Sequence, residues 1–291
     1  MNQTVKEIGK KLVALIPSKP WLSYRFKQKM GYSIDWKNPQ TYSQKLQWLK
    51  VYDRNPLYTT LVDKYEVKKY VADKIGEQYI IPTLGVWDAF DEIDFDTLPE
   101  QFVLKCTHDS GGLIIVKDKS KLDREAARKM FKVCLNRNPY DVSREWPYKN
   151  VKPRIIAETY MEDEKTAELR DYKFFAFRGE VKAMFIASER ASETEETKFD
   201  FFDENFNHLP FTNGHPNAKV PPEKPENFEE MKSLAAFLSK DLPQARIDFY
   251  EVNGKTYFGE ITFFHWGGTK PFDPVEWDYT FGSWIQLPKK K

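Results

Sequence analysis

Residues 245–264 read ARIDFYEVNGKTYFGEITFF, and they hold two runs of alternating polar and apolar side chains around Asn253-Gly254. The alternation and the Asn-Gly pair predict a β-hairpin. Successive side chains of a strand point to opposite faces of a sheet, so the core face carries Ile247, Phe249, Ile261 and Phe263. The opposite face then carries four polar side chains: Arg246, Asp248, Glu260 and Thr262.

The register of this hairpin depends on its loop. A two-residue turn at Asn253-Gly254 would set Asp248 opposite Gly259 and would mix the polar and apolar faces. A three-residue loop over 252–254, with Gly254 in the left-handed conformation, sets Glu260 opposite Arg246 and keeps both faces uniform. We therefore predict the three-residue loop or an equivalent bulge.

The polar face of the hairpin brings two carboxylates next to an arginine. Asp248 and Glu260 repel each other unless positive charge lies between them. Mg²⁺ suits such a pair because it binds one or two carboxylates together with phosphate oxygens. A solvent-facing hairpin in which Arg246 neutralises Glu260 explains the same residues, and the hairpin alone leaves both interpretations open.

A second informative stretch is FVLKCTHDSGG, residues 102–112. An apolar strand ends here on Lys105, and a polar loop with two glycines follows. A lysine and the backbone N–H groups of a Gly-rich loop can together hold a phosphate. The alternative is a strand, a turn and a solvated lysine.

The rest of the chain predicts an α+β fold with antiparallel sheets. Residues 1–78 favour helices, with Thr41 or Ser43 as one N-cap and Gly76 at a C-terminus. Further helices are expected over 123–137 and 228–242. Between them, DYKFFAF and EVKAMFIAS are expected to form an antiparallel pair that turns at Arg178-Gly179.

Composition limits the classes of function. The 291 residues have a net charge of +1, which gives no general attraction to nucleic acid. Cys106 and Cys134 fit no metal-binding spacing, so we expect a reducing, cytoplasmic location. The first helix, VKEIGKKLVALI, has an apolar stripe flanked by Lys6, Lys10 and Lys11. It either packs on its own domain or contacts the inner face of a membrane or a biosynthetic complex.

Six blocks, taken in order, resemble an ATP-grasp enzyme. They are TYSQKLQWLK, DKYEVKKYV, LPEQFVLKCTHDSGG, VKPRIIAETYM, LRDYKFFAFRGEV and the hairpin, and they span nearly the whole chain. The similar branch is that of the teichuronopeptide-biosynthesis protein of surface-polysaccharide gene clusters. The resemblance implies two α+β subdomains that clasp ATP: 79–157 with the glycine loop and 158–288 with the metal-binding hairpin. A helical region over 1–78 would precede them, and a flexible tail over 289–291 would follow.

The resemblance also implies roles for single residues. Lys64 and Lys105 would contact phosphates, and the loop from Thr107 to Gly112, with Asp109, Ser110 and Gly111, would cover them. Glu158 and Tyr160 would line the adenine pocket, and Asp171 would meet the ribose. Arg246 matches the active-site arginine, and Asp248 and Glu260 match the Mg²⁺ ligands. Thr262 stands where many relatives have Asn, so it would be a weaker ligand, and the site could hold one metal or two. His108 lies in the phosphate loop as a candidate catalytic residue or a simple loop contact, and His265 is expected to bind substrate.

The implied activity is an ATP-dependent ligase that joins a carboxylate to an amine through an acyl phosphate. Its substrate would be a sugar acid or amino acid of a capsular or teichuronic-type surface polysaccharide. Asp94-Phe95-Asp96 fits the DxD pattern of sugar-nucleotide transferases, so a glycosyltransferase-type enzyme is the alternative; an acidic connector also explains that pattern. A binding protein that kept only the fold is a third hypothesis. The intact set of Lys64, Lys105, Asp248 and Glu260 argues against it.

Overall fold

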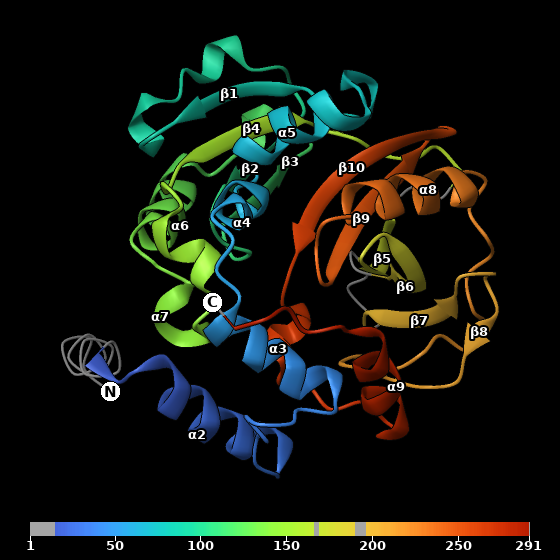
Figure 1. The fold of residues 1–291 in the computed structure, drawn as a ribbon. Coiled ribbons are helices and arrows are strands. Elements are labelled where there is room, and N and C mark those ends of the chain that lie inside the picture. Colours follow the sequence, from blue (N-terminus) through green and yellow to red (C-terminus); the bar gives the residue numbers. More distant parts are fainter. Residues whose placement is uncertain (1–14, 166–168, 190–195, 291) are drawn as a thin grey trace.

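A computed structural model describes residues 15–165, 169–189 and 196–290 (Figure 1). The predicted basic helix over 5–16 falls almost wholly outside these ranges, as does Lys291. Its contact with a membrane or a partner therefore stays a prediction. Within the described residues no helix is both long and apolar enough to cross a membrane.

The smaller of two sheets has four antiparallel strands in the order β1-β4-β2-β3. Their bounds are β1 Thr83–Trp87, β2 Phe102–Cys106, β3 Leu113–Val116 and β4 Ile155–Thr159. Helix α6, Arg124–Leu135, lies against this sheet, and its Ala127, Phe131 and Cys134 share one buried cluster with Phe102, Leu104 and Ile155. This core is separate from that of the larger sheet.

The larger sheet has six antiparallel strands in the order β10-β9-β5-β6-β7-β8. Their bounds are β5 Asp171–Phe177, β6 Glu180–Ser188, β7 Lys198–Asp203, β8 His208–Leu209, β9 Ala245–Val252 and β10 Lys255–Thr262. The predicted turn between β5 and β6 is confirmed, with Arg178 and Gly179 both at positive φ. The α+β class with antiparallel sheets is confirmed too.

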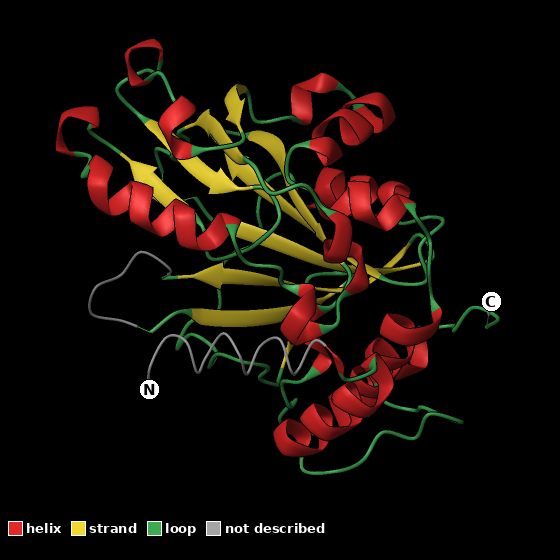
Figure 2. Ribbon diagram, turned by 90° about the vertical axis from the view of Figure 1, so that its left-hand side faces the viewer, coloured by secondary structure: helices red, strands yellow, loops and turns green. Residues whose placement is uncertain are grey.

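Helices surround the strands on both sides (Figure 2). Their bounds are α2 Ser18–Met30, α3 Tyr42–Tyr52, α4 Leu57–Val62, α5 Glu66–Ile75, α7 Tyr140–Ser143, α8 Phe228–Leu238 and α9 Glu276–Trp284. Short 3-10 segments lie at Glu77–Tyr79, Phe90–Glu92, Phe95–Thr97, Lys119–Lys121, Trp146–Asn150 and His265–Gly268. Thr41 caps α3 by accepting from the Gln44 N–H, as the sequence predicts.

The N-terminal helices do not build a core of their own. Leu46 of α3, Leu61 of α4 and Val71 of α5 belong to the same buried cluster as the strands of the larger sheet. The chain segment between α4 and α5 is thereby fixed beside the edge strand β10. This placement matters because Lys64 lies in that segment.

The hairpin of β9 and β10 corrects the predicted register. Its loop has two residues, not three, since Val252 pairs with Lys255 and both Asn253 and Gly254 have positive φ. The register then shifts between Phe258 and Glu260, so Glu260 lies opposite Asp248 and not opposite Arg246. The expected bulge exists, but at Gly259 in the strand.

Glycine suits the bulge because a Cβ at residue 259 would lie 3.1 Å from the Asp248 carbonyl oxygen. The extra residue restores the alternation that a tight turn would otherwise break. Ile247 pairs with Ile261 on the core face, while Arg246 pairs with Thr262 on the polar face. The prediction of two uniform faces is therefore confirmed.

Candidate functional site

A charged cavity of about 170 Å³ lies where the two sheets face each other across the α4–α5 connection. Lys105 and Glu158 reach it from the smaller sheet, and Asp171, Lys173 and Glu260 reach it from the larger one. Its remaining lining residues are Lys64, Asp109, Ser110, Gly112, Leu113, Tyr250 and Gly259. Segments far apart in sequence thus build one site.

A second, more apolar cavity of about 300 Å³ adjoins the first. The two cavities share Lys105, Leu113, Glu158 and Tyr250. The rest of the second cavity is lined by Ile81, Val103, Ile115, Lys117, Thr159, Tyr160, Met161, Glu162 and Leu169. An apolar chamber that opens into a charged one suits a ligand with a flat ring at one end and anionic groups at the other.

Arg246 is the centre of the polar face of the hairpin. Its Nε and Nη2 both donate to the Asp248 carboxylate at 2.7 Å, and Nη2 also donates to Glu260 Oε1 at 2.9 Å. Burial acts to raise the pKa of Glu260, but the positive charges of Lys64, Arg246 and Lys173 outweigh it and lower that pKa to about 2. Glu260 is therefore a carboxylate at every physiological pH.

Asp248 and Glu260 differ in how far they are available to a cation. Asp248 is 0% exposed, and both of its oxygens accept from Arg246, with Lys173 as a further donor. Glu260 lines the charged cavity, and Arg246 and Thr262 both bond its Oε1, so neither occupies Oε2. The Glu260 carboxylate thus fits a Mg²⁺ ligand as it stands, whereas Asp248 fits only if its bonds to Arg246 open.

Glu158 is held between two lysines at the boundary of the two cavities. Lys105 Nζ lies 2.5 Å from one of its oxygens and Lys68 Nζ lies 2.6 Å from the other. Burial opposes ionisation, but the two ammonium groups lower the pKa of Glu158. The sequence interpretation missed Lys68. Lys68 could have been found from its position in the DKYEVKKYV block, because it lies on the turn of α5 that follows Lys64.

The glycine loop binds the carboxylate of one of its own residues, Asp109. Asp109 Oδ1 accepts from the backbone N–H groups of Gly111 and Gly112 at 2.8 and 2.9 Å. Lys64 Nζ donates to the carbonyl oxygen of Asp109 at 2.8 Å. The amides that we predict to hold a phosphate therefore do bind an anionic oxygen, and in this structure the oxygen belongs to the protein.

Two predicted loop residues are not brought to the cavities. His108 is 1% exposed, and its Nε2 lies 3.2 Å from the Cys134 carbonyl oxygen and 3.1 Å from that of Arg137, at the end of α6. Thr107 is fully buried, and its hydroxyl donates to the Lys152 carbonyl. Neither side chain lines the two cavities. A catalytic role for His108 has no support in this geometry.

The other predicted residues all border the cavities or the hairpin cluster. Tyr160 lines the apolar cavity, and Asp171 lines the charged one. A further lysine, Lys173, lies between Asp171 and Asp248, 3.3 Å from an Asp171 oxygen. Thr262 receives a bond from Arg246 and donates to Glu260, which makes its hydroxyl a link between those two groups.

His265 fixes the far side of Arg246. Asn213 Nδ2 donates to the carbonyls of Lys270 and Pro271, so its Oδ1 must accept, and the His265 Nε2–H is the donor at 3.0 Å. His265 Nδ1 is then unprotonated and accepts from Arg246 Nη1 at 2.9 Å. Burial, reinforced by Arg246 and Lys173, lowers the pKa of His265 well below its usual value. The ring is neutral and positions the guanidinium.

The DxD pattern has a local structural role. Asp94 Oδ1 accepts from the Asp96 N–H at the start of a 3-10 turn, and Phe95 is buried in the smaller core. Neither carboxylate lines the two cavities. A wider surface depression of about 630 Å³ lies between β3 and α6, and it contains none of the predicted site residues.

Two antiparallel sheets with an apolar chamber and a lysine–carboxylate chamber between them have the architecture of the ATP-grasp class. The chain belongs to the TupA-like ATP-grasp family, whose model matches residues 44–286. No curated protein matches the chain.

Among solved structures, the chain resembles D-alanine–D-alanine ligase from Bacillus anthracis complexed with ATP. The identity is 18%, the TM-score is 0.40, and the match covers 70% of this chain and 55% of that one. For the same ligase from Helicobacter pylori the identity is 17% and the TM-score is 0.42, and the match covers 84% of this chain and 69% of that one. For L-amino acid ligase from Bacillus licheniformis the identity is 13% and the TM-score is 0.47, and the match covers 76% of this chain and 48% of that one. The chain thus spans about half the length of the first and third of these.

Proposed function

We propose that this protein is an ATP-dependent ligase that joins a carboxylate to an amine through an acyl phosphate. The observation that carries the proposal is the convergence of Lys64, Lys105 and Glu260 on one charged cavity beside an apolar chamber, in a member of the ATP-grasp family. Phosphoryl transfer depends on positioning and charge neutralisation, and this cavity supplies both.

The shape of the two chambers would orient the nucleotide. The adenine ring would occupy the apolar chamber beside Tyr160, and the phosphates would pass Lys105 into the charged chamber. Lys64 lies next to the glycine loop. The phosphate oxygens would replace the Asp109 carboxylate on the amides of Gly111 and Gly112, because those N–H groups are already aimed at an anion.

The hairpin would supply the cation site and the position of the acceptor. Glu260 would hold Mg²⁺, and Asp248 would join it if Arg246 turns from its carboxylate toward the substrate. A bound Mg²⁺ supplies neutralisation of the charge on the transferring phosphoryl group. Arg246, released in this way but still held by His265, would then bind the carboxylate of the substrate.

The two chemical steps balance without a protein nucleophile. A carboxylate oxygen of the substrate attacks the γ-phosphorus, the bond to the β-phosphate oxygen breaks, and ADP leaves. The amine nitrogen then attacks the acyl carbon of the acyl phosphate, inorganic phosphate leaves, and the amine releases a proton. Neither step requires an oxidant or a reductant.

An isotope experiment tests this order of events. The protein is incubated with ATP, Mg²⁺ and amine acceptors, together with ¹⁸O-carboxylate forms of uronic acids and amino acids. An acyl phosphate transfers one ¹⁸O from the carboxylate to the released phosphate. ADP release without any ¹⁸O in the phosphate would contradict the mechanism.

The biological setting is also a proposal. The resemblance to the teichuronopeptide branch supports a sugar acid or an amino acid of a surface polysaccharide as substrate, and a site of action at the cytoplasmic side of the cell envelope. The glycosyltransferase alternative has lost its sequence support, since Asp94 and Asp96 form a local turn away from the cavities. Thermal protection by ATP but not by nucleotide sugars would agree with this choice.

A further inference from the structure

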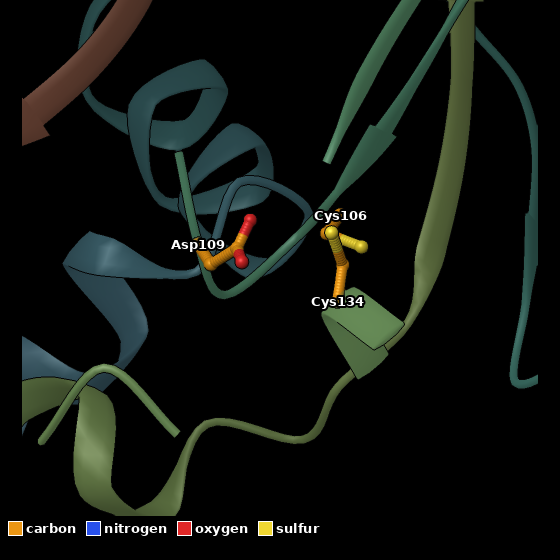
Figure 3. A group of neighbouring side chains, drawn as sticks. All are labelled: Cys106, Asp109 and Cys134. Carbon is orange, nitrogen blue, oxygen red and sulfur yellow. The ribbon is translucent and has the colours of Figure 1, made fainter. Parts of the chain in front are cut away.

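Cys106, Cys134 and Asp109 form a compact cluster that the proposed ligase reaction does not use (Figure 3). Cys106 ends β2, Cys134 lies near the end of α6, and Asp109 comes from the glycine loop. One potential ligand atom from each residue lies within 4.8 Å of the other two. Neither cysteine is in a disulfide. Two sulfur atoms and a carboxylate oxygen at this spacing need only small shifts to surround a single ion.

We propose that Cys106, Cys134 and Asp109 bind a thiophilic divalent cation of the Zn²⁺ class, and that this cation holds the glycine loop against α6. Sulfur ligands favour Zn²⁺ over Mg²⁺, whereas the carboxylate oxygens of the hairpin favour Mg²⁺. The two sites therefore differ in the cation they take as well as in their place in the fold.

Charge balance permits a cation at this cluster. Two thiolates and the Asp109 carboxylate carry a formal charge of −3. The nearest positive groups are Lys64, on the Asp109 carbonyl oxygen, and Arg137, whose Nη1 lies 3.9 Å from Asp109 Oδ2. With both thiols ionised these five groups sum to −1, and a divalent ion brings the sum to +1, the same value as with both thiols protonated and no ion, so binding adds no net charge to the cluster.

The thiols are protonated when no cation is present. Burial, with a further contribution from Asp109, raises the pKa of Cys106 to about 12, and burial also raises the pKa of Cys134. A bound cation reverses this preference, so binding releases two protons to solvent while the two sulfurs and the carboxylate become ligands. No redox step is involved.

The surroundings of Asp109 support a ligand role. Metal-binding carboxylates are commonly held by hydrogen bonds from a second layer of groups. Asp109 Oδ1 has two such bonds, from Gly111 and Gly112, and Oδ2 lies 3.9 Å from Arg137 Nη1, so hydrogen bonds and a nearby cation fix the carboxylate. Asp109 and Gly112 also line the charged cavity, so the cluster borders that cavity on the side of the loop.

Gly112 closes the loop over the sulfurs. Its carbonyl oxygen accepts from the Cys106 N–H at 2.7 Å, and a Cβ at residue 112 would lie 2.6 Å from Cys106 Sγ. A cation here would fix Asp109 in the position that occupies the loop amides. This consequence rests on the proposed function: Zn²⁺ would compete with the phosphates of ATP although it binds elsewhere.

Titration of the reduced, metal-free protein with Co²⁺ alone tests the site. We expect a thiolate-to-cobalt charge-transfer band in the near ultraviolet that saturates at one equivalent and disappears when Zn²⁺ is added. Cys106→Ser and Cys134→Ser should lose the band. Asp109→Asn should keep a weaker band, with Co²⁺ affinity lower by about tenfold or more. Glu260→Gln is the matched control and should give the same charge-transfer band as wild type, because it removes a carboxylate of the other site.

A second measurement keeps the test independent of how well the serine variants fold. Zn²⁺ should slow the reaction of the two wild-type thiols with a disulfide reagent by more than tenfold. Equal thiol reactivity with and without Zn²⁺, or no charge-transfer band in the wild type, overturns the proposal. Both readouts omit ATP, so a failed ligase assay leaves them interpretable. If the site exists and the ligase proposal holds, Zn²⁺ weakens ATP binding in the wild type but not in Cys134→Ser.

Discussion

Replacing Asp248 with Asn separates the structural role of this carboxylate from its role as a metal ligand. Asp248 is 0% exposed, and it accepts from two Arg246 nitrogens and from Lys173. The side chains of Arg246 and Lys173 are only 11% and 12% exposed. An Asn side chain has the shape of Asp, but its NH₂ group would replace one accepting oxygen and would face the N–H donors of Arg246 or Lys173. The substitution also removes the negative charge that neutralises these two buried cations.

The expected cost follows from the burial of the partners. Breaking a buried ion pair by removing one partner costs about 3–5 kcal/mol. Glu260 still bonds Arg246, so we expect the lower end, about 3 kcal/mol in the free energy of unfolding. At roughly 2 °C per kcal/mol for a chain of this size, the melting temperature should fall by about 6 °C.

Glu260→Gln is the matched control. The Glu260 side chain is 37% exposed, and Gln keeps an oxygen that can accept from Arg246 and Thr262. Its cost should be about 1 kcal/mol or less. Both variants should lose ATP turnover, so urea unfolding is the measurement that distinguishes them. If Asp248→Asn unfolds within about 1 kcal/mol of wild type, the buried-network account of this carboxylate is wrong.

Three further predictions test the hairpin and its supports. Folding lowers the pKa of Glu260 to about 2, so its ionised form stabilises the fold above about pH 4.5, and that contribution is lost as the pH falls toward 2. The stability difference between wild type and Glu260→Gln, measured by urea unfolding, should therefore shrink over that window and stay constant above it. Asn213→Asp should raise the pKa of His265, because the new carboxylate favours the protonated ring, and a protonated ring cannot accept a hydrogen bond from Arg246. The rate of ADP release should then decrease at pH values below about 7 in the variant but not in wild type. Identical pH profiles for the two proteins would contradict the positioning role of His265. Gly259→Ala should cost about 1–3 kcal/mol, because the new Cβ meets the Asp248 carbonyl, and unchanged unfolding would argue against the bulge.

The polar face of the hairpin could be predicted because alternation is a local property of a strand. Ile247 and Ile261 face the core, and Arg246 and Thr262 share the other face, as expected. The register could not be predicted, because a two-residue turn and a bulge at Gly259 give the same uniform faces as a three-residue loop. The two solutions differ in their strand pairing, and the structure pairs Val252 with Lys255 and Asp248 with Glu260.

The loop shows where local sequence stops being informative. His108 and Asp109 are neighbours in the same polar stretch, yet His108 contacts the end of α6 while Asp109 holds the glycine amides. That difference depends on α6, whose position no residue of the loop encodes. Asn213 was missed for the same reason, since it lies in a long Pro- and Asn-rich segment and meets His265 only through the fold.

The cysteines illustrate the same limit. Their spacing of 28 residues fits no sequence motif for a metal, and it predicted only a reducing environment. The pairing of β2 with β3 and the packing of α6 bring them together next to the glycine loop. A site assembled from a strand end, a helix end and a loop leaves no pattern in the order of residues.

Calorimetric titration with ATP and Mg²⁺ tests the central claim most directly. Wild type should bind one ATP per chain, and Lys105→Met should bind it at least about tenfold more weakly, a loss of about 1.4 kcal/mol, because Lys105 lies where the two cavities meet. Lys69→Met is the matched control, since Lys69 is 81% exposed on α5 and should bind ATP as wild type does. Absence of ATP binding by the wild type, or equal affinity in Lys105→Met, would contradict the assignment of these cavities to a nucleotide.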